Sequence, residues 1–283
     1  MPRETDKSAQ SGRYRGRIAP TPSGWLHPGH ASTFRTAWKR AREAGGTLVY
    51  RLEDIDPARN RDEYIKGAVE DLQWCGLDWD EGPDCGGAHG PYEQSRRKAL
   101  YQSAFAKLRD LGRIYPSPHS RKDIRAANPV PSPIDGDPIF PPAMRPPNTA
   151  VRSQTPETGV NWRFRVPDGR IIRFIDNRLG EQAFMAGRDF GDFIIWKRDN
   201  WPAYELAVVV DDEAMRITEV VRGEDLLVST ARQLLLYEAF GWSAPEWYHC
   251  ELVIDPSTGH RMSKTNKSIS LRALRAAGEK APV

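Results

Sequence analysis

Cysteine and long hydrophobic runs are both scarce in this chain of 283 residues. The three cysteines, Cys75, Cys85 and Cys250, form no Cys-x-x-Cys pair and are too few for a disulfide scaffold. We therefore expect a reducing, cytoplasmic location. No apolar run approaches the length that spans a bilayer, and residues 1–15 lack the apolar segment of a signal peptide. The sequence predicts a soluble protein without membrane contact and with a disordered tail over residues 1–15.

A strong charge of one sign is also missing, because the formal net charge is only +3 at pH 7. The overall field is therefore a weak argument for nucleic-acid binding. Local clusters of basic residues would have to supply the attraction, and the candidates lie within residues 35–42, 96–98 and 121–125. Each cluster is equally typical of a solvated helix face, so both interpretations stay open.

Strands and helices alternate through the first part of the chain. A short apolar strand that contains Arg17 precedes a turn rich in proline and glycine, and a helical pattern follows over 31–44. Residues 47–52 favour a strand, and 62–74 and 96–111 favour amphipathic helices. Such alternation is typical of a parallel sheet covered by helices.

The composition changes after Tyr115, since residues 116–147 hold ten of the 23 prolines. Proline at this density fixes loops and prevents a regular ladder. Apolar and charged residues alternate over 161–175, which favours an antiparallel element in an inserted module. Residues 193–196 and 206–210 then have the character of buried strands, and Asp211-Asp212 follows the second of them directly. We predict an α/β fold, a Rossmann-like parallel sheet split by an inserted α+β module.

A first polar motif, His27-Pro28-Gly29-His30, lies where the first predicted strand turns into the first predicted helix. The N-terminus of a helix offers unpaired N–H groups and a partial positive charge to anions. His27 and His30 could donate hydrogen bonds to a transferring phosphoryl group, and Gly29 would let a flat base approach the backbone. The alternative is a turn with two solvated histidines.

A second motif, Arg261-Met262-Ser263-Lys264-Thr265, follows an apolar run and a turn near the end of the chain. An exposed loop of this composition can close over a triphosphate, with Lys264 as a point charge and hydroxyls as donors. Taken alone, a solvated run of charges explains it as well.

Together the two motifs resemble the His-Ile-Gly-His and Lys-Met-Ser-Lys-Ser signatures of class I aminoacyl-tRNA synthetases. Further segments in family order narrow the resemblance to the glutamate-specific branch: Arg17–Gly24, Arg51–Asp56, Tyr204–Asp212 and Val221–Asp225. Only 18 residues follow Thr265, too few for the anticodon-reading region of a glutamyl-tRNA synthetase. The chain is therefore most similar to the truncated branch, the glutamyl-Q tRNA(Asp) synthetases, which attach glutamate to the queuosine base of tRNA(Asp).

The resemblance implies a catalytic domain in two halves, residues 16–114 and 186–250. Between them, residues 115–185 would form an inserted acceptor-binding-like module with a proline-rich loop. Residues 251–283 would carry the lysine loop and a C-terminal segment. It also implies L-glutamate, ATP with Mg²⁺, and tRNA(Asp) carrying queuosine as partners, and we expect a monomer.

The resemblance assigns a role to each matching position. Glutamate would be bound by Arg17, Ala19, Thr21, Glu53, Tyr204 and Arg222. ATP would be bound by His27, Gly29, His30, Arg261, Ser263 and Lys264, of which His27, His30 and Lys264 would be catalytic. The residue types suit these roles, because an arginine can fork a carboxylate and Glu53 can hold an ammonium. Arg261 stands where the signature has its first lysine.

Members of this family often carry a zinc site in the insertion, built from cysteines and a tyrosine. The corresponding positions here are Ser117, His119, Phe140 and Met144, and only the histidine is a good zinc ligand. We expect no zinc. Two other functions stay open: a minimal synthetase that charges a tRNA 3′ end with glutamate, and a non-catalytic tRNA-binding paralogue.

Overall fold

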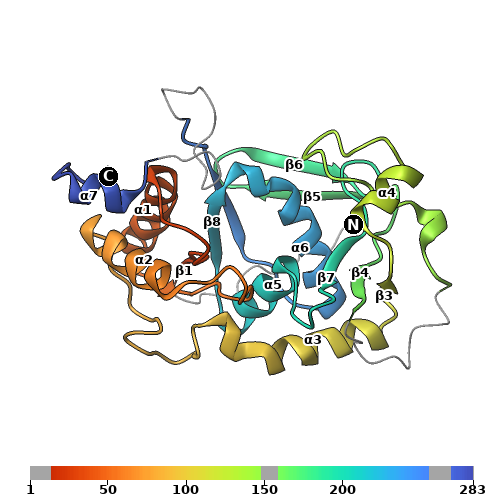
Figure 1. Ribbon diagram of the computed structural model, residues 1–283, viewed down its shortest axis with the longest axis horizontal. Coiled ribbons are helices and arrows are strands. Elements are labelled where there is room, and N and C mark those ends of the chain that lie inside the picture. Colours follow the sequence, from red (N-terminus) through yellow and green to blue (C-terminus); the bar gives the residue numbers. More distant parts are fainter. Residues whose placement is uncertain (1–13, 148–158, 255–268, 283) are drawn as a thin grey trace, which may run out of the picture.

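A computed structural model describes residues 14–147, 159–254 and 269–282 of the chain. Its centre is made of parallel strands (Figure 1). Strand β1 (Arg15–Ile18) pairs with β2 (Thr47–Tyr50), and β8 (Glu219–Gly223) pairs with β9 (Glu246–Cys250). The N–H of Thr218 donates to the Arg15 carbonyl over 2.9 Å, so the two pairs lie side by side with β1 next to β8.

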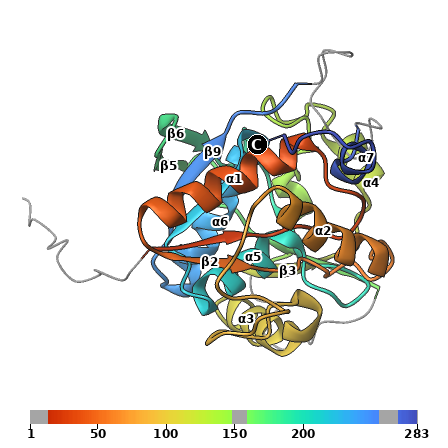
Figure 2. The ribbon, with the colours of Figure 1, turned by 90° about the vertical axis from the view of Figure 1, so that its left-hand side faces the viewer.

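Helix α1 (Pro28–Glu43) covers one face of these strands, with α2 (Asp62–Trp74) and α7 (Leu271–Ala276) beside it (Figure 2). Its buried side chains are all alanines, namely Ala31, Ala37 and Ala41. Small side chains let the helix approach the sheet closely, which brings its N-terminus to the ends of β1 and β8. On the other side of the strands lie α3 (Lys98–Asp110), α5 (Tyr204–Ala214) and α6 (Leu227–Phe240).

The segment between the two parallel pairs forms two antiparallel units. The first is a sheet of β3 (Ile114–Ser117), β4 (Asn161–Phe164) and β7 (Phe193–Trp196), with α4 (Arg121–Ala127) attached to it. The second is a hairpin of β5 (Ile171–Asp176) and β6 (Gly180–Met185). Strand β5 also pairs in parallel with β9 at Asp176 and Trp247, which gives the order β6-β5-β9-β8. The hairpin therefore extends the parallel sheet.

The prediction of a mixed α/β fold with a parallel sheet is confirmed. The helix predicted over 62–74 is α2, and the helix predicted from residue 31 begins at Pro28, because proline suits the first position of a helix. The prediction of a strand over 206–210 is wrong, since these residues belong to α5. This helix is buried continuously from Glu205 to Asp212, so it lacks the polar stripe that would have marked it as helical.

The predicted tail falls almost wholly on residues 1–13, which lie outside the described residues, and β1 begins at Arg15. Within the described part of the chain, no helix combines the length and apolar character needed to cross a bilayer.

Candidate functional site

A pocket of about 540 Å³ lies where the carboxyl ends of the parallel strands meet the N-terminus of α1. Each strand contributes residues at or just beyond its end: Ala19 after β1, Glu53 after β2, Gly223 on β8 and Glu251 after β9. Nine of the predicted site residues line it together: Arg17, Ala19, Thr21, His27, Gly29, His30, Glu53, Tyr204 and Arg222. The remaining three, Arg261, Ser263 and Lys264, lie outside the described residues.

The two histidines of the first motif form one wall of the pocket. His27 is buried just before α1, and its ring lies against that of His30 with 3.7 Å between the centroids. The His27 backbone N–H donates to Nδ1 of His30 over 3.2 Å, which fixes the His30 ring at the first helical turn. A Cβ on Gly29 would lie 3.0 Å from the His27 ring, so glycine at this position also keeps room for that imidazole.

Arg17 enters the pocket from β1. It is 5 % exposed, and its Nη1 donates to the Val221 carbonyl of β8 over 2.7 Å. The nearest carboxylate is that of Asp212, whose Oδ1 lies 3.8 Å from Arg17 Nε. Burial lowers the pKa of the Arg17 guanidinium, and the Asp212 carboxylate opposes this effect. The side chain is thus a buried cation that is held by a neutral carbonyl at one end of its guanidinium.

Glu53 is held in place by two other buried charged side chains, Arg51 and Asp212. Arg51, which is fully buried, donates to Asp212 Oδ1 over 2.6 Å and to Glu53 Oε1 over 3.0 Å. Burial raises the pKa of Glu53, whereas Arg51 and Arg17 lower it. A substrate ammonium at Glu53 would favour the ionised carboxylate in the same way. The prediction that Asp212 lies just beyond a strand is wrong. Asp212 belongs to α5 and accepts a hydrogen bond from Arg51.

Arg222 enters the pocket from β8 and is 4 % exposed. Its Nη2 donates to Thr230 Oγ1 over 2.7 Å, and its Nη1 donates to Gln233 Oε1 over 3.0 Å. A longer contact of 3.4 Å joins Nη1 to the hydroxyl of Tyr204, the first residue of α5. These partners are neutral, and no carboxylate within the described ranges forms an ion pair with Arg222. A buried cation among neutral acceptors is well suited to bind a substrate carboxylate.

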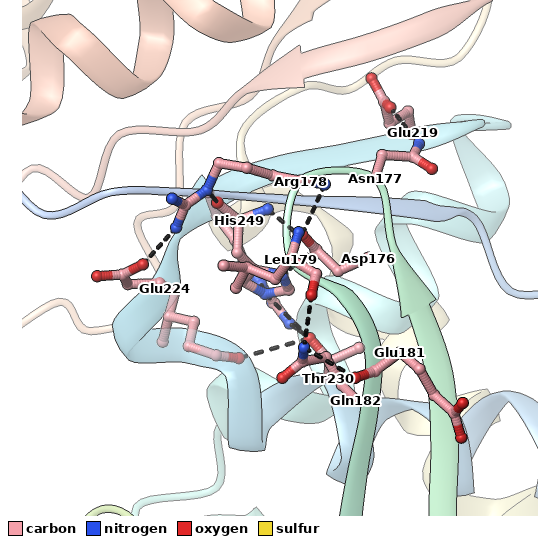
Figure 3. A network of polar contacts seen from close by, with 12 residues as sticks. Asp176, Asn177, Arg178, Leu179, Glu181, Gln182, Glu219, Glu224, Thr230 and His249 are labelled. Atoms are coloured by element: carbon pink, nitrogen blue, oxygen red, sulfur yellow. Dashed lines mark hydrogen bonds and ion pairs between the residues drawn. The ribbon is translucent and has the colours of Figure 1, made fainter.

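The fourth partner of Arg222 is His249, on β9. Arg222 Nε donates to His249 Nε2 over 3.2 Å, while His249 Nδ1 lies 2.7 Å from Asp176 Oδ2 at the end of β5 (Figure 3). An arginine N–H can only donate, so Nε2 must accept and the ring proton lies on Nδ1. Burial, together with the Arg222 charge, lowers the pKa of His249 to about 4, which keeps the ring neutral at neutral pH.

Sequence reasoning placed Asp212 in the wrong element and missed five other residues that support the predicted site residues directly or through a neighbour: Arg51, Asp176, Thr230, Gln233 and His249. No spacing links Asp176 to His249, which are separated by 73 positions. Only the polarity of Thr230 and Gln233 within an apolar helical run could have indicated a buried polar partner.

Two of the four positions that the resemblance assigns to zinc, Ser117 and Phe140, contact a protein cation, Arg163. Arg163, on β4, donates from Nε to the buried Ser117 Oγ over 3.3 Å, and its guanidinium lies 4.8 Å from the Phe140 ring centroid. The His119 ring lies 6.0 Å from the same phenylalanine, and Met144 packs on the adjoining core. A guanidinium in this place repels a second cation. Across the described residues, no three His, Cys, Asp or Glu side chains are grouped to hold a metal ion.

Comparison with known proteins identifies the family of the chain. Residues 13–281 match the family model for the catalytic domain of class I tRNA synthetases (E and Q). The chain is 45 % identical over 267 residues to the glutamyl-Q tRNA(Asp) synthetase of Symbiobacterium thermophilum, covering 93 % of this chain and 81 % of that protein. It is equally similar to the enzyme of the same name from Nitratidesulfovibrio vulgaris, over 266 residues that cover 93 % and 82 % of the two chains.

A solved structure shares the fold. The glutamate-tRNA synthetase of Elizabethkingia anophelis superimposes with a TM-score of 0.76 at 30 % sequence identity. The match covers 90 % of this chain but only 53 % of that one, so the chain spans about half the length of this relative. The family match encloses the whole pocket described above. The chain therefore belongs to the class I tRNA synthetases of the E and Q group, a family of ATP-dependent ligases.

Proposed function

We propose that this protein activates L-glutamate with ATP, without requiring tRNA, and transfers the glutamate to the queuosine base of tRNA(Asp). The proposal has two separable parts, the activation of the amino acid and the choice of the RNA acceptor. The site geometry supports the first part, and the names of the two relatives at 45 % identity support the second.

The observation that carries the first part is the charge pattern of the pocket. Two buried cations, Arg17 and Arg222, and one buried anion, Glu53, line the same cavity. Glutamate presents the complementary set, with two carboxylates and one ammonium. We assign the carboxylates to the arginines and the ammonium to Glu53, since each pairing brings opposite charges together within the pocket. Tyr204 would add a hydroxyl to the same pocket.

The N-terminus of α1 supports ATP binding beside the glutamate. No acidic side chain lies in the first turn of this helix, so its partial positive charge is not offset there. His27, Gly29 and His30 line the pocket from this end. We propose that the two histidines donate to the triphosphate, and that Arg261, Ser263 and Lys264 complete the phosphate site.

In the proposed reaction an oxygen of the glutamate α-carboxylate attacks the α-phosphorus of MgATP. The bond from that phosphorus to the β-phosphate bridging oxygen breaks, and the products are glutamyl-adenylate and pyrophosphate. No protein nucleophile is required, so catalysis rests on positioning and on hydrogen-bond donors directed at the phosphates. The described side chains provide no cluster of metal ligands, and the Mg²⁺ would enter with ATP, held by phosphate oxygens and water.

Glutamate-dependent exchange of pyrophosphate into ATP, measured without tRNA, tests the activation step. We expect exchange with L-glutamate and none with aspartate or glutamine. The Lys264→Ala variant should lose exchange, whereas Lys66→Ala, on α2 and away from the pocket, should keep it. Exchange that appears only after tRNA is added would contradict the tRNA-independent mechanism.

Transfer of labelled glutamate to RNA tests the acceptor. We expect labelling of tRNA(Asp) that carries queuosine and no labelling of the same tRNA prepared without queuosine. Equal labelling of both would indicate a synthetase that charges the tRNA 3′ end. Binding of tRNA with neither exchange nor labelling would instead indicate a non-catalytic paralogue.

A further inference from the structure

The hydrogen bonds around Arg222 determine which way its guanidinium faces. Four of its five N–H groups have partners: His249, Thr230 and Gln233 at 2.7 to 3.2 Å, and the Tyr204 hydroxyl at 3.4 Å. These contacts engage all three nitrogens of the planar group, so it cannot rotate without breaking at least one of them. Within the described residues, the second N–H of Nη2 has no partner and is available to a ligand in the pocket that Arg222 lines.

His249 can hold Arg222 only in one protonation form. The contact needs a lone pair on Nε2, and this exists only while the ring proton lies on Nδ1. Asp176 imposes that form, because its Oδ2 accepts from the ring at Nδ1 and from the backbone N–H of His249 over 3.0 Å. The Oδ1 atom of Asp176 accepts from the backbone N–H groups of Arg178 and Leu179, which locks the carboxylate in the β5–β6 turn (Figure 3).

We propose that Asp176 and His249 are positioning residues for substrate recognition: Asp176 fixes the tautomer of His249, and His249 aims the Arg222 guanidinium at a carboxylate of the bound amino acid. This inference rests on the proposed function, in which Arg222 binds such a carboxylate. Neither Asp176 nor His249 lines the pocket, so both act through Arg222 and not by touching the substrate.

The contact of His249 Nδ1 with Asp176 and that of Nε2 with Arg222 can be separated by substitution. In His249→Asn the amide takes the place of Nδ1 and keeps the contact with Asp176, but no acceptor reaches Arg222. In His249→Gln the amide oxygen extends to the place of Nε2 and can still accept from Arg222. We therefore expect the KM for glutamate in the exchange reaction to rise about tenfold or more in His249→Asn, and much less in His249→Gln. The KM for ATP should stay unchanged in both variants.

Asp176→Asn tests the tautomer directly. Its amide group would donate to Nδ1 and move the ring proton to Nε2, where it opposes the N–H of Arg222 and can be donated only to Thr230 Oγ1, 3.1 Å away. We expect a rise in the glutamate KM of at least about tenfold, and nitrogen NMR shifts of the His249 ring that report the exchanged tautomer. Asp189→Asn is the matched control, because Asp189 is equally buried and also accepts a backbone N–H, from Met185, but lies outside the pocket.

The outcomes separate the two proposals. If the wild-type protein neither binds glutamate in calorimetry nor supports exchange, the proposed function fails and the positioning role falls with it. If the wild type is active and His249→Asn binds glutamate as tightly as His249→Gln does, the positioning role alone is overturned. Should Asp176→Asn not fold, as judged by circular dichroism, the two histidine variants decide, since both leave the Asp176 turn intact.

Discussion

The imidazole rings of His27 and His30 lie against each other with 3.7 Å between their centroids, and Nδ1 of His30 accepts the backbone N–H of His27. In the neutral ring of His30 this contact places the proton on Nε2. The first turn of α1 thus orients one of the two histidines as a hydrogen-bond donor before any nucleotide arrives.

The His30→Asn variant separates the helix contact from the donor. Its amide oxygen can still accept the His27 N–H, while the Nε2 donor is lost. We expect kcat of glutamate-dependent exchange to fall about 100-fold with little change in the glutamate KM. Steady-state exchange kinetics check this, with Ser32→Ala, an exposed position on the same helix, as the control. An unchanged kcat would exclude His30 from the phosphate site.

Gly29→Ala tests the packing between the motif glycine and His27. The new methyl group would lie 3.0 Å from the His27 ring, closer than side chains normally pack, so the ring must shift. We expect kcat of exchange to fall about tenfold, because small displacements of catalytic donors are costly. Thermal unfolding should change little, and a large drop in Tm would instead mean that Gly29 acts on folding.

Arg222→Lys should impair glutamate binding even though the charge is kept. A single ammonium cannot serve His249, Thr230 and Gln233 and a substrate carboxylate at once. We expect the glutamate KM to rise roughly 100-fold, with the KM for ATP within a factor of two. Arg170→Lys, an exposed arginine paired with Glu238, should leave both constants unchanged. A parallel loss of ATP affinity would argue against a specific role in binding glutamate.

Stability should fall in mildly acidic solution because of His249. Its folded pKa of about 4 lies below the ordinary value of 6.5, so the unfolded chain takes up this proton first. The stability tied to the neutral ring is complete above pH 6.5 and is lost as the pH falls toward 4, by about 3 kcal/mol in all. Asp176 faces the ring from β5, and Arg222 and Arg17 act on it from β8 and β1.

Urea unfolding at a series of pH values measures this dependence. Asp176 also makes stability fall with falling pH, but at still lower pH. Burial raises the pKa of its carboxyl, and hydrogen bonds from His249 and from the following backbone N–H groups outweigh this effect and lower it. His249→Gln removes the titrating ring, so its free energy of unfolding should depend less on pH between 6.5 and 4. An identical slope in both proteins would contradict the assignment.

Zinc should have no part in the stability of the inserted segment. Arg163 contacts Ser117 and Phe140, two of the positions that the family resemblance assigns to zinc ligands. We expect a zinc chelator to leave Tm unchanged, and Arg163→Ala to lower the free energy of unfolding by about 2 kcal/mol through the lost contacts. Metal analysis of the purified protein is the independent check, and a stoichiometric zinc content would refute the prediction.

The sequence was sufficient to predict that the pocket residues converge, because the motifs mark turns that follow strands. Parallel strands end at one edge of the sheet, so Ala19 and Glu53, which follow β1 and β2, were bound to lie near each other. The type of one element could not be predicted. Leu206 to Val210 are apolar and mostly branched, and burial on every side hides the helical period of α5.

The buried charges behind the pocket were equally hidden. Buried ion pairs such as Arg51 with Asp212 join positions 161 apart in the chain, and nothing in local composition links them. Asp211 and Asp212 were expected to be site residues at the end of a strand. In the structure they neutralise the buried arginines Arg97 and Arg51. Polar residues in an apolar segment can therefore indicate either a ligand-binding site or a buried ion pair.

Strand β5 connects the segment of residues 115–185 to the parallel sheet. Asp176 at its end lies within residues 115–185, yet its carboxylate contacts His249 on β9 of the parallel sheet. If His249 positions Arg222 as we propose, residues 115–185 contribute to the proposed amino-acid site as well as to the predicted acceptor-binding-like module. Under this proposal, a chimera that exchanged the segment between relatives would have to preserve the aspartate at the β5–β6 turn, or its affinity for the amino acid would fall.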